Sequence, residues 1–161
     1  MARGRPRNGK KYHQGTYHVV NTSKYLGNNG IAVWRSSWER KSFVILDRSD
    51  KVLKWSSESI SIPYSDPTRG GSIHQYIVDL FIQYIDVRTD KTVTLLAEIK
   101  PFSQTQLPVR GKKGKKSRAT YMYQILDYAR NQAKWRSAKS YCEKKGWKFV
   151  IWTEKGSNLF S

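Results

Sequence analysis

The stretch HQYIVDLFIQYIDVRTDKTVTLLAEIKP, residues 74–101, decides the fold. Its two apolar halves are rich in aromatic and β-branched residues, which is typical of strands. Only the short polar segment TDKT, residues 89–92, separates them. Two strands joined by so short a turn are expected to form an antiparallel hairpin. Each half also carries a carboxylate among apolar neighbours, Asp79 in the first strand and Glu98 in the second.

These charges need an explanation, because an unpaired ion on a buried strand face is costly. Glu98 and Lys100 are two positions apart and therefore point to the same side of their strand. Asp79, on the partner strand, is expected to converge on Glu98, and two nearby carboxylates repel each other unless a cation lies between them. Carboxylate oxygens suit Mg²⁺, and Lys100 would orient or deprotonate an attacking water or stabilise charge on a phosphate. The structural alternative is a hydrogen-bonded buried Asp79 and a Glu98–Lys100 pair on a half-exposed strand.

Upstream of the hairpin, the segment Ser36-Ser37-Trp38-Glu39 has the capping-box pattern that begins a helix. We expect this helix over residues 37–47, with Trp38, Phe43 and Leu46 on its buried face. Glu39 occupies the third helical position, where its carboxylate has a capping role. It is also a possible fourth group of the acidic cluster, and the two roles are compatible.

The remaining elements complete an α/β pattern. Residues 54–64 alternate as a strand that ends at Pro63, and SDPTRGG, residues 65–71, has the composition of a turn. Helical spacing runs over residues 120–145, with a possible break near Asn131, and Gly146 ends the helix. The last strand is predicted in WKFVIWTE, residues 147–154. The order α, β, β, β, α, β predicts a mixed β-sheet flanked by helices.

The chain is strongly basic, with 30 Lys and Arg against 12 Asp and Glu, a formal net charge of +18. This charge is typical of a protein that binds a polyanion such as DNA. The sequence has no apolar run of about 18 residues and no signal-type segment, so we expect no membrane partner. The single cysteine, Cys142, excludes an internal disulfide and is typical of a reducing compartment, and the three scattered histidines make a zinc site improbable.

Two basic segments are expected to hold the DNA backbone. We divide the chain into a basic N-terminal arm, residues 1–30, and a domain, residues 31–161, that contains a basic loop at residues 103–118. Segments rich in Gly and Lys contact phosphates and do not read bases, so we expect little sequence specificity and a strong salt dependence. A solubilising tail is the alternative for the arm. The predicted phosphate contacts are Arg3, Arg5, Arg7, Arg110, Lys112, Lys113, Lys115, Lys116 and Arg118.

The acidic residues also form a known pattern. Asp79 followed by Glu98-Ile99-Lys100 resembles the PD-(D/E)xK nuclease motif, with Val78 in place of its proline. The wider sequence is similar to the head completion nucleases of T-even-type tailed phages and, more distantly, to TnsA-like transposon endonucleases. This resemblance covers roughly residues 3–155. The segments that carry it are SSWER (36–40), WSSESISIPYSDP (55–67), QYIVDLFI (75–82), LLAEIKP (95–101), NQAKW (131–135) and FVIWTE (149–154).

The resemblance implies a restriction-endonuclease-like core and a DNA endonuclease that depends on Mg²⁺, with Mn²⁺ as a substitute and no small-molecule cofactor. It implies that Asp79, Glu98 and the backbone carbonyl of Ile99 bind the metal, that Glu39 joins this site, and that Lys100 positions the attacking water. On the second helix, Gln124 and Lys134 are further candidates for DNA contacts. An exposed structural role is the alternative for Gln124. Trp135 is expected in the core, Glu154 is a weak extra candidate for the site, and His74 is left out of it.

The resemblance further implies a role in completing the phage head after DNA packaging. Phage head and portal proteins would then be partners besides DNA, and the protein would be found in the host cytoplasm or in the virion head. Two alternatives stay open. One is a non-enzymatic head protein that binds DNA and seals the portal, and the other is a transposon-type or junction-resolving endonuclease of the same fold.

Overall fold

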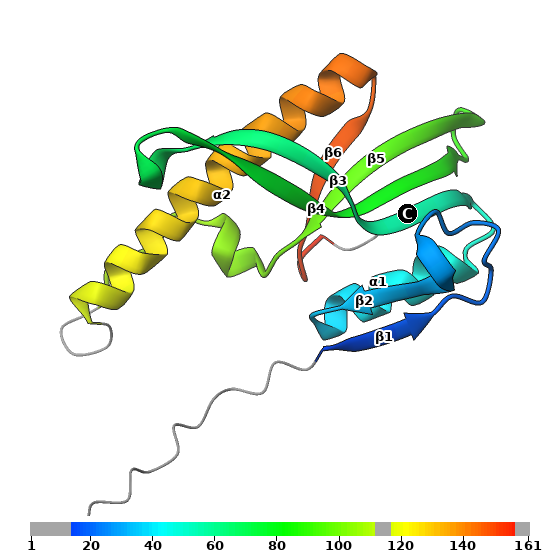
Figure 1. Ribbon diagram of the computed structural model, residues 1–161, viewed down its shortest axis with the longest axis horizontal. Coiled ribbons are helices and arrows are strands. Elements are labelled where there is room, and N and C mark those ends of the chain that lie inside the picture. Colours follow the sequence, from blue (N-terminus) through cyan, green and yellow to red (C-terminus); the bar gives the residue numbers. More distant parts are fainter. Residues whose placement is uncertain (1–13, 112–116, 157–161) are drawn as a thin grey trace, which may run out of the picture.

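The protein forms one mixed sheet with a helix on each face, together with a small two-stranded sheet. The computed structural model describes residues 14–111 and 117–156 (Figure 1). The main sheet has the strand order β3-β4-β5-β6, in which β5 and β6 are parallel and the other pairs are antiparallel. The predicted hairpin and the mixed α/β sheet are therefore confirmed. The main-sheet strands are β3 (Val52–Asp66), β4 (Ser72–Asp86), β5 (Lys91–Ile99) and β6 (Lys148–Trp152).

The two helices begin and end at the expected sequence signals. In α1 (Ser37–Arg48) the Ser36 hydroxyl accepts a hydrogen bond from the Glu39 backbone N–H at 3.2 Å, as predicted. In α2 (Arg118–Lys145) Ser117 caps the first turn in the same way, and Gly146 ends the helix in the left-handed conformation with a φ of 68°. The helix α2 is continuous, so the possible break near Asn131 is wrong. Short 3₁₀ turns lie at η1 (Asn28–Gly30), η2 (Pro67–Arg69) and η3 (Phe102–Thr105).

Each face of the main sheet has its own hydrophobic cluster. One cluster packs α1 against the sheet through Phe43, Leu46 and Trp55, all at most 1% exposed. The other packs α2 against the opposite face through Ala138, Cys142 and the strand residues around Ile62. Figure 1 shows α1 with the short strands β1 (Gly15–His18) and β2 (Ile31–Trp34) on one side of the sheet and α2 on the other. Burial on both faces accounts for the continuous apolar runs at residues 80–82 of β4 and 95–97 of β5, whereas β3 alternates between buried and exposed residues.

The N-terminal boundary differs from the prediction. Residues 14–30 were expected in the basic arm, but β1 (Gly15–His18) pairs antiparallel with β2 (Ile31–Trp34), and Val19 is buried in the core. The globular part therefore includes residues from 14 onward. These two four-residue strands escape a pattern search because they are too short to show alternation.

A buried carboxylate fixes this N-terminal segment to α1. Asp47 is fully buried and accepts hydrogen bonds from the Tyr17 hydroxyl at 2.7 Å, from the Val20 N–H at 2.8 Å and from the Asn21 N–H at 2.9 Å. Burial on its own would raise the pKa of Asp47, but these donors together hold that pKa below its ordinary value. Asp47 is therefore a structural anion.

A bulge in β3 lies where the long β3–β4 hairpin passes from one hydrophobic cluster to the other. The pairing register shifts between Ser57 and Ile60, and Glu58 has a φ of 48°. Ser57 pairs with Leu80 of β4 and Ile60 pairs with Val78, so Asp79 is the β4 residue opposite the bulge. The bulge thus lies beside the candidate site.

The predicted loop 103–118 contains η3 except for its first residue, Phe102, and the first residue of α2. Residues 106–111, which follow η3, are irregular. Four of its predicted contacts, Lys112, Lys113, Lys115 and Lys116, lie outside the described residues, as do Arg3, Arg5 and Arg7. Within residues 14–111 and 117–156, neither helix is apolar enough over a sufficient length to cross a membrane.

Candidate active site

The open end of the β4–β5 hairpin, opposite its turn, brings the predicted catalytic residues together. The described pairing of β4 with β5 ends at Leu80 and Ala97, and one further step in the same register places Asp79 opposite Glu98. The Ile99 backbone N–H donates a hydrogen bond to Asp79 Oδ2 at 2.7 Å. On the same side of β5, Lys100 Nζ is 3.3 Å from Glu98 Oε1, and the Glu98 residue is only 4% exposed. The expected convergence of two carboxylates and a lysine is thus present in the geometry.

The electrostatics of this cluster are those of crowded, partly buried anions. Burial first, and then the negative charge of Glu98, raise the pKa of Asp79 to about 8, although the Ile99 N–H and Lys100 oppose the shift. Burial alone would lower the pKa of Lys100, but the charges of Glu98 and Asp79 outweigh it and raise that pKa above its ordinary value. Lys100 is therefore a cation that partly balances the two carboxylates.

Glu39 lies at the first turn of α1 and has the predicted capping role. One of its carboxylate oxygens accepts from the Arg35 backbone N–H at 2.7 Å, and the other accepts from the Ser36 hydroxyl at 3.1 Å. Its negative charge also reaches Asp79 and contributes to the raised pKa of that residue. Capping and proximity to the site therefore coexist in this glutamate.

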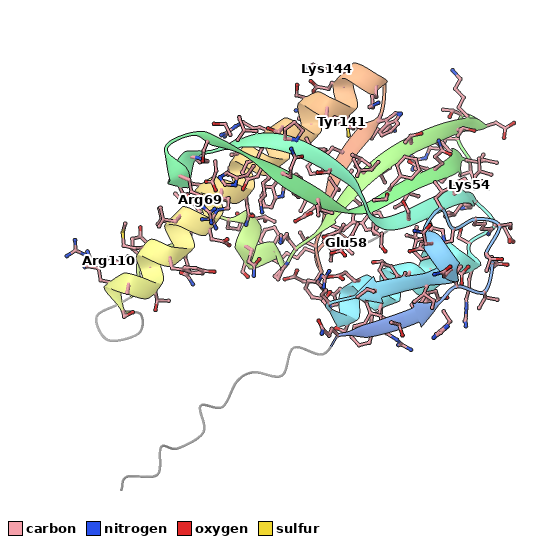
Figure 2. The ribbon with its side chains drawn as sticks, viewed as in Figure 1. Lys54, Glu58, Arg69, Arg110, Tyr141 and Lys144 are labelled. Carbon is pink, nitrogen blue, oxygen red and sulfur yellow. The ribbon has the colours of Figure 1, made fainter. Side chains whose placement is uncertain are left out.

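An ion pair that the sequence does not reveal lies beside the cluster. Arg35 donates two hydrogen bonds to Glu58, from Nε to Oε1 at 3.0 Å and from Nη2 to Oε2 at 2.9 Å. The bond to Glu58 raises the pKa of Arg35, and the charges of Glu39 and Asp79 add to this shift. Figure 2 shows Glu58 where β3 passes the segment formed by β2 and α1. Only the bulge in β3 brings Glu58 to this position, and no local sequence pattern predicts that bulge.

The second helix contributes Lys134, one of the predicted DNA contacts. Its Nζ lies over the rings of Tyr64 and Tyr76, at 5.7 and 5.6 Å from their centroids. Burial, followed by the positive charge of Lys100, lowers the pKa of Lys134, and the negative charge of Glu98 opposes this shift. The carboxylate of Asp127, one of the residues on α2 that the sequence did not single out, acts electrostatically on both lysines.

The other predicted residues lie farther along α2 or have structural roles. Gln124 is half-buried and lines a groove between α2 and the segment that follows η3. Arg110 and Arg118 lie together beside the first turns of α2, and Figure 2 shows Arg110 at that end of the helix, away from Glu58. Trp135 is 6% exposed and belongs to the core, as expected. His74, which was left out of the site, contacts the Ser72 hydroxyl through Nε2 at 2.9 Å.

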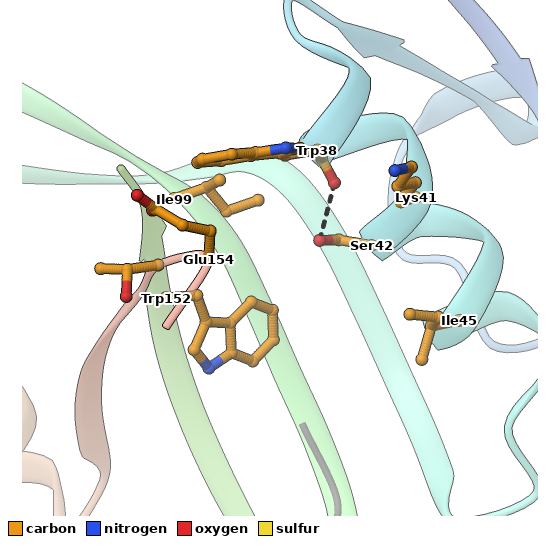
Figure 3. A pocket seen from close by; sticks show the side chains of 8 residues that line it. Trp38, Lys41, Ser42, Ile45, Ile99, Trp152 and Glu154 are labelled. Carbon is orange, nitrogen blue, oxygen red and sulfur yellow. Dashed lines mark hydrogen bonds between the residues drawn. The ribbon is translucent and has the colours of Figure 1, made fainter. Parts of the chain in front are cut away.

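A pocket of about 250 Å³ lies on the α1 side of Ile99 (Figure 3). Figure 3 shows the Trp38 indole on one side of the pocket and Trp152 on the other. The Ser42 hydroxyl of α1 donates a hydrogen bond to the Trp38 carbonyl. Glu154 also lines this pocket, and its carboxylate accepts from the Phe102 N–H at 2.8 Å. That bond gives the weak candidate Glu154 a structural role in holding η3 to the end of β6.

The donor set of the cluster fits a hard divalent cation. No group of three or more His, Cys, Asp and Glu side chains converges as a ready-made ligand set within the described ranges. Mg²⁺, however, needs only one or two carboxylates and takes waters and substrate phosphate as its other ligands. Asp79, Glu98 and the Ile99 carbonyl supply such oxygens. Burial, and after it the negative charge of Glu98, raises the pKa of Asp79, so a divalent cation between the two carboxylates would offset their repulsion.

The fold and this cluster define a nuclease of the TnsA-like class. The family model described as TnsA-like endonuclease N terminal matches residues 49–154, and the chain belongs to this family. The matched region includes Asp79, Glu98 and Lys100 but not Glu39. Family membership gives the chain a nuclease role, with DNA as the substrate.

Among individual proteins, the chain is similar to the head completion nuclease of Enterobacteria phage T4. The two sequences are 32% identical over 145 residues, which cover 89% of this chain and 93% of the relative. The resemblance seen in the sequence is therefore confirmed for both families.

Proposed function

We propose that the protein is a Mg²⁺-dependent DNA endonuclease that hydrolyses phosphodiester bonds at the cluster of Asp79, Glu98 and Lys100. The observation that carries this proposal is the geometry of the cluster. Two carboxylates and a lysine gather at the end of one hairpin, with Lys100 Nζ 3.3 Å from Glu98 Oε1, in a chain of net charge +18. A basic protein that concentrates acids at one buried point has an arrangement suited to metal-assisted chemistry on a polyanion.

The residues of the cluster have distinct roles in this mechanism. Asp79, Glu98 and the Ile99 carbonyl would hold the Mg²⁺ ion, with Mn²⁺ as a substitute and Glu39 as a further acidic group. When bound, this ion supplies charge stabilisation and lowers the pKa of a coordinated water. The Ile99 N–H holds the carboxylate of Asp79 in place. Lys100 orients the attacking water and stabilises negative charge on the phosphate.

Binding to the DNA backbone is assigned to basic residues around this cluster. Lys134, on which the charges of Lys100 and Glu98 act, would contact a phosphate close to the cleaved bond, and Arg110 and Arg118 would contact other phosphates. The basic segments outside the described residues are assigned further phosphate contacts. These contacts are assigned to phosphates, which carry no sequence information, so cleavage would have little sequence specificity.

We further propose that the activity serves head completion after DNA packaging. The support is the name of the relative from phage T4, which covers nearly the whole chain. Head and portal proteins would be the partners, and the host cytoplasm or the virion head the location. A junction-resolving or transposon-type substrate remains the alternative for the same chemistry.

A plasmid-cleavage assay tests the enzymatic proposal. Supercoiled plasmid is incubated with Mg²⁺ or EDTA and with wild type, Asp79→Asn or Lys100→Met. Matched controls on the same two strands are Asp86→Asn, at the far end of β4, and Lys91→Met, at the start of β5. We expect wild type and both controls to cleave with Mg²⁺ only, and the two site variants to lose about 100-fold or more in rate.

Two results would count against the proposal. Equal cleavage by the site variants and their controls would remove this cluster from catalysis. Absence of cleavage by wild type, with DNA binding intact, would favour the non-enzymatic head-sealing alternative.

A further inference from the structure

A buried tyrosine contacts the acidic cluster from within the core. The hydroxyl of Tyr76, a residue only 3% exposed, donates a hydrogen bond to Glu98 Oε2 at 2.6 Å. Lys100 contacts the other oxygen, Oε1, at 3.3 Å. The two oxygens of Glu98 thus have different partners, one neutral and one cationic.

We propose that Tyr76 is a positioning residue that fixes the Glu98 carboxylate in the orientation required for metal binding. This inference rests on the proposed function, because it assigns Glu98 as a metal ligand. It adds a residue of the core to the site and explains how a flexible glutamate side chain is held.

The two carboxylates of the cluster are held in different ways. Asp79 has a short side chain, and its Oδ2 accepts from the backbone N–H of Ile99. The side chain of Glu98 is one methylene longer, and no hydrogen bond from a backbone N–H reaches it within the described residues. Its neutral donor is the Tyr76 hydroxyl, and a hydrogen bond to a carboxylate in a buried environment is short and strong. Without this donor, the contact with the Lys100 side chain would be the remaining polar contact of the Glu98 carboxylate among the described residues.

The tyrosine ring is itself well fixed. Tyr76 belongs to the hydrophobic cluster under α2, together with Ile62, Val78 and Ala138. The ammonium group of Lys134 lies over its ring at 5.6 Å from the centroid. The hydroxyl therefore has little freedom to follow a moving carboxylate, which is the property required of a group that orients a metal ligand.

Tyr64 supplies a matched control. It is also buried, at 5% exposed, belongs to the same hydrophobic cluster, and lies under the same Lys134 at 5.7 Å. Its hydroxyl, however, is directed to Asp66 at 3.5 Å and not to Glu98. Tyr64→Phe therefore repeats the chemical change and the core environment of Tyr76→Phe without removing a contact to the site.

The experiment compares wild type, Tyr76→Phe and Tyr64→Phe in two measurements. Mn²⁺ binding is measured by calorimetry without DNA, and the Mg²⁺ concentration for half-maximal plasmid cleavage is measured separately. Loss of a group that orients a metal ligand weakens metal binding by about 10- to 100-fold. We expect this loss for Tyr76→Phe in both measurements, with the cleavage rate at saturating Mg²⁺ within about threefold of wild type. Tyr64→Phe should match wild type in both.

The outcomes separate this inference from the proposed function. Equal Mn²⁺ affinity of wild type, Tyr76→Phe and Tyr64→Phe would overturn the role of Tyr76 while leaving the metal site intact. Absence of Mn²⁺ binding by wild type would overturn the proposed metal site and the inference with it. Similar weakening in Tyr76→Phe and Tyr64→Phe would show a general effect on the core and would also overturn the inference.

A double-mutant cycle covers the case in which Tyr76→Phe alters the folding of the core. Glu98→Asp shortens the side chain and withdraws its carboxylate from Tyr76. If Tyr76 acts through Glu98, Tyr76→Phe should reduce Mn²⁺ affinity less in the Glu98→Asp background than in wild type. The same reduction in both backgrounds would contradict the inference.

Discussion

Asp79 is the residue on which the electrostatics of the site depend most. Its pKa is raised to about 8 by burial and by the charge of Glu98, against an ordinary value near 4 in an unfolded chain. The folded, metal-free protein therefore holds a proton on Asp79 that the unfolded chain releases at much lower pH. A divalent cation would replace that proton, which couples metal binding to pH.

The first prediction concerns the pH dependence of stability without metal. A carboxyl group with a raised folded-state pKa stabilises the folded state fully below its unfolded pKa, and this stabilisation is lost as the pH rises through the folded value. In EDTA, the contribution of Asp79 to the free energy of unfolding should thus fall between about pH 4 and about pH 8. Thermal denaturation across this range measures it.

The control for this prediction is Asp79→Asn, which has no proton to release. It should show a smaller loss of stability than wild type over the same pH range, and added Mg²⁺ should stabilise wild type more than the variant at the upper end. Parallel pH profiles for the two proteins would contradict the electrostatic account of Asp79.

At the residue scale, part of the site follows from the sequence. Asp79 and Glu98 stand out because each is an acid within an apolar strand, and strand alternation places Lys100 beside Glu98. Tyr76 does not stand out, because a tyrosine in a strand has an ordinary core role. In the β4–β5 register the position opposite Glu98 belongs to Asp79, three residues away from Tyr76. The hydrogen bond from Tyr76 depends on side-chain reach, which a pairing register does not give.

Among the elements, α1 has two functions at its N-terminus. Ser36 and Glu39 form the cap, and the same glutamate adds negative charge near Asp79. Replacing the Glu39 carboxylate by the amide of Gln keeps a hydrogen-bond acceptor for the cap but removes the negative charge. The effects of Glu39 on stability and on catalysis can therefore be measured separately.

The second prediction uses this difference. Glu39→Gln should keep the stability of the helix within about 0.5 kcal/mol of wild type but reduce Mg²⁺-dependent cleavage by about tenfold or more. Ser36→Ala should have the opposite profile, with a loss of about 1 kcal/mol in stability and little change in cleavage. Urea denaturation and plasmid cleavage measure the two effects. Unchanged cleavage by Glu39→Gln would restrict Glu39 to capping.

The third prediction concerns the attachment of the β1–β2 segment to α1. Asp47→Asn replaces a buried anion with an amide that accepts more weakly from the Tyr17 hydroxyl and the two backbone N–H groups, and it should cost about 3 kcal/mol in the free energy of unfolding. The exposed neighbour Asp50 gives the control, because Asp50→Asn should change stability by less than about 0.5 kcal/mol. Equal effects of the two variants would show that Asp47 does not anchor this segment.

The elements differ in how well the sequence predicts them. The two helices follow from their caps, and the β4–β5 hairpin follows from its composition and short turn. The strands β1 and β2 are missed because each has only four residues, and β1 is held in place by a group distant in the sequence, through the hydrogen bond from Tyr17 to Asp47. The bulge at Glu58 is also missed, since the register shift between Ser57 and Ile60 and the positive φ of Glu58 have no counterpart in a local sequence pattern.

For the whole molecule, the main feature is the contrast between a basic chain and an acidic site. A net charge of +18 attracts DNA over a long range. The cluster of Asp79 and Glu98 would repel phosphate unless Lys100, Lys134 and a bound cation offset it. The fold class follows from the order of elements in the sequence, and so does the convergence of Asp79, Glu98 and Lys100, whereas the position of Lys134 over the rings of Tyr64 and Tyr76 becomes visible only in the structure.

The fourth prediction follows from this charge. The affinity for a duplex of about 20 base pairs should fall by about 10³-fold between roughly 50 and 200 mM salt, as expected for about six phosphate contacts. Duplexes of scrambled sequence should bind within about threefold of one another, because phosphate contacts carry no sequence information. Fluorescence anisotropy measures both quantities. A nearly salt-independent affinity, or a strong preference for one sequence, would contradict binding through the backbone.

Anomalous diffraction from crystals soaked in Mn²⁺ shows whether Asp79 and Glu98 form one metal site. We expect an anomalous peak between the carboxylates of Asp79 and Glu98 and close to the Ile99 carbonyl, and no peak at this position in crystals of Asp79→Asn. A peak elsewhere on the molecule, or the same peak in the variant, would contradict this metal site.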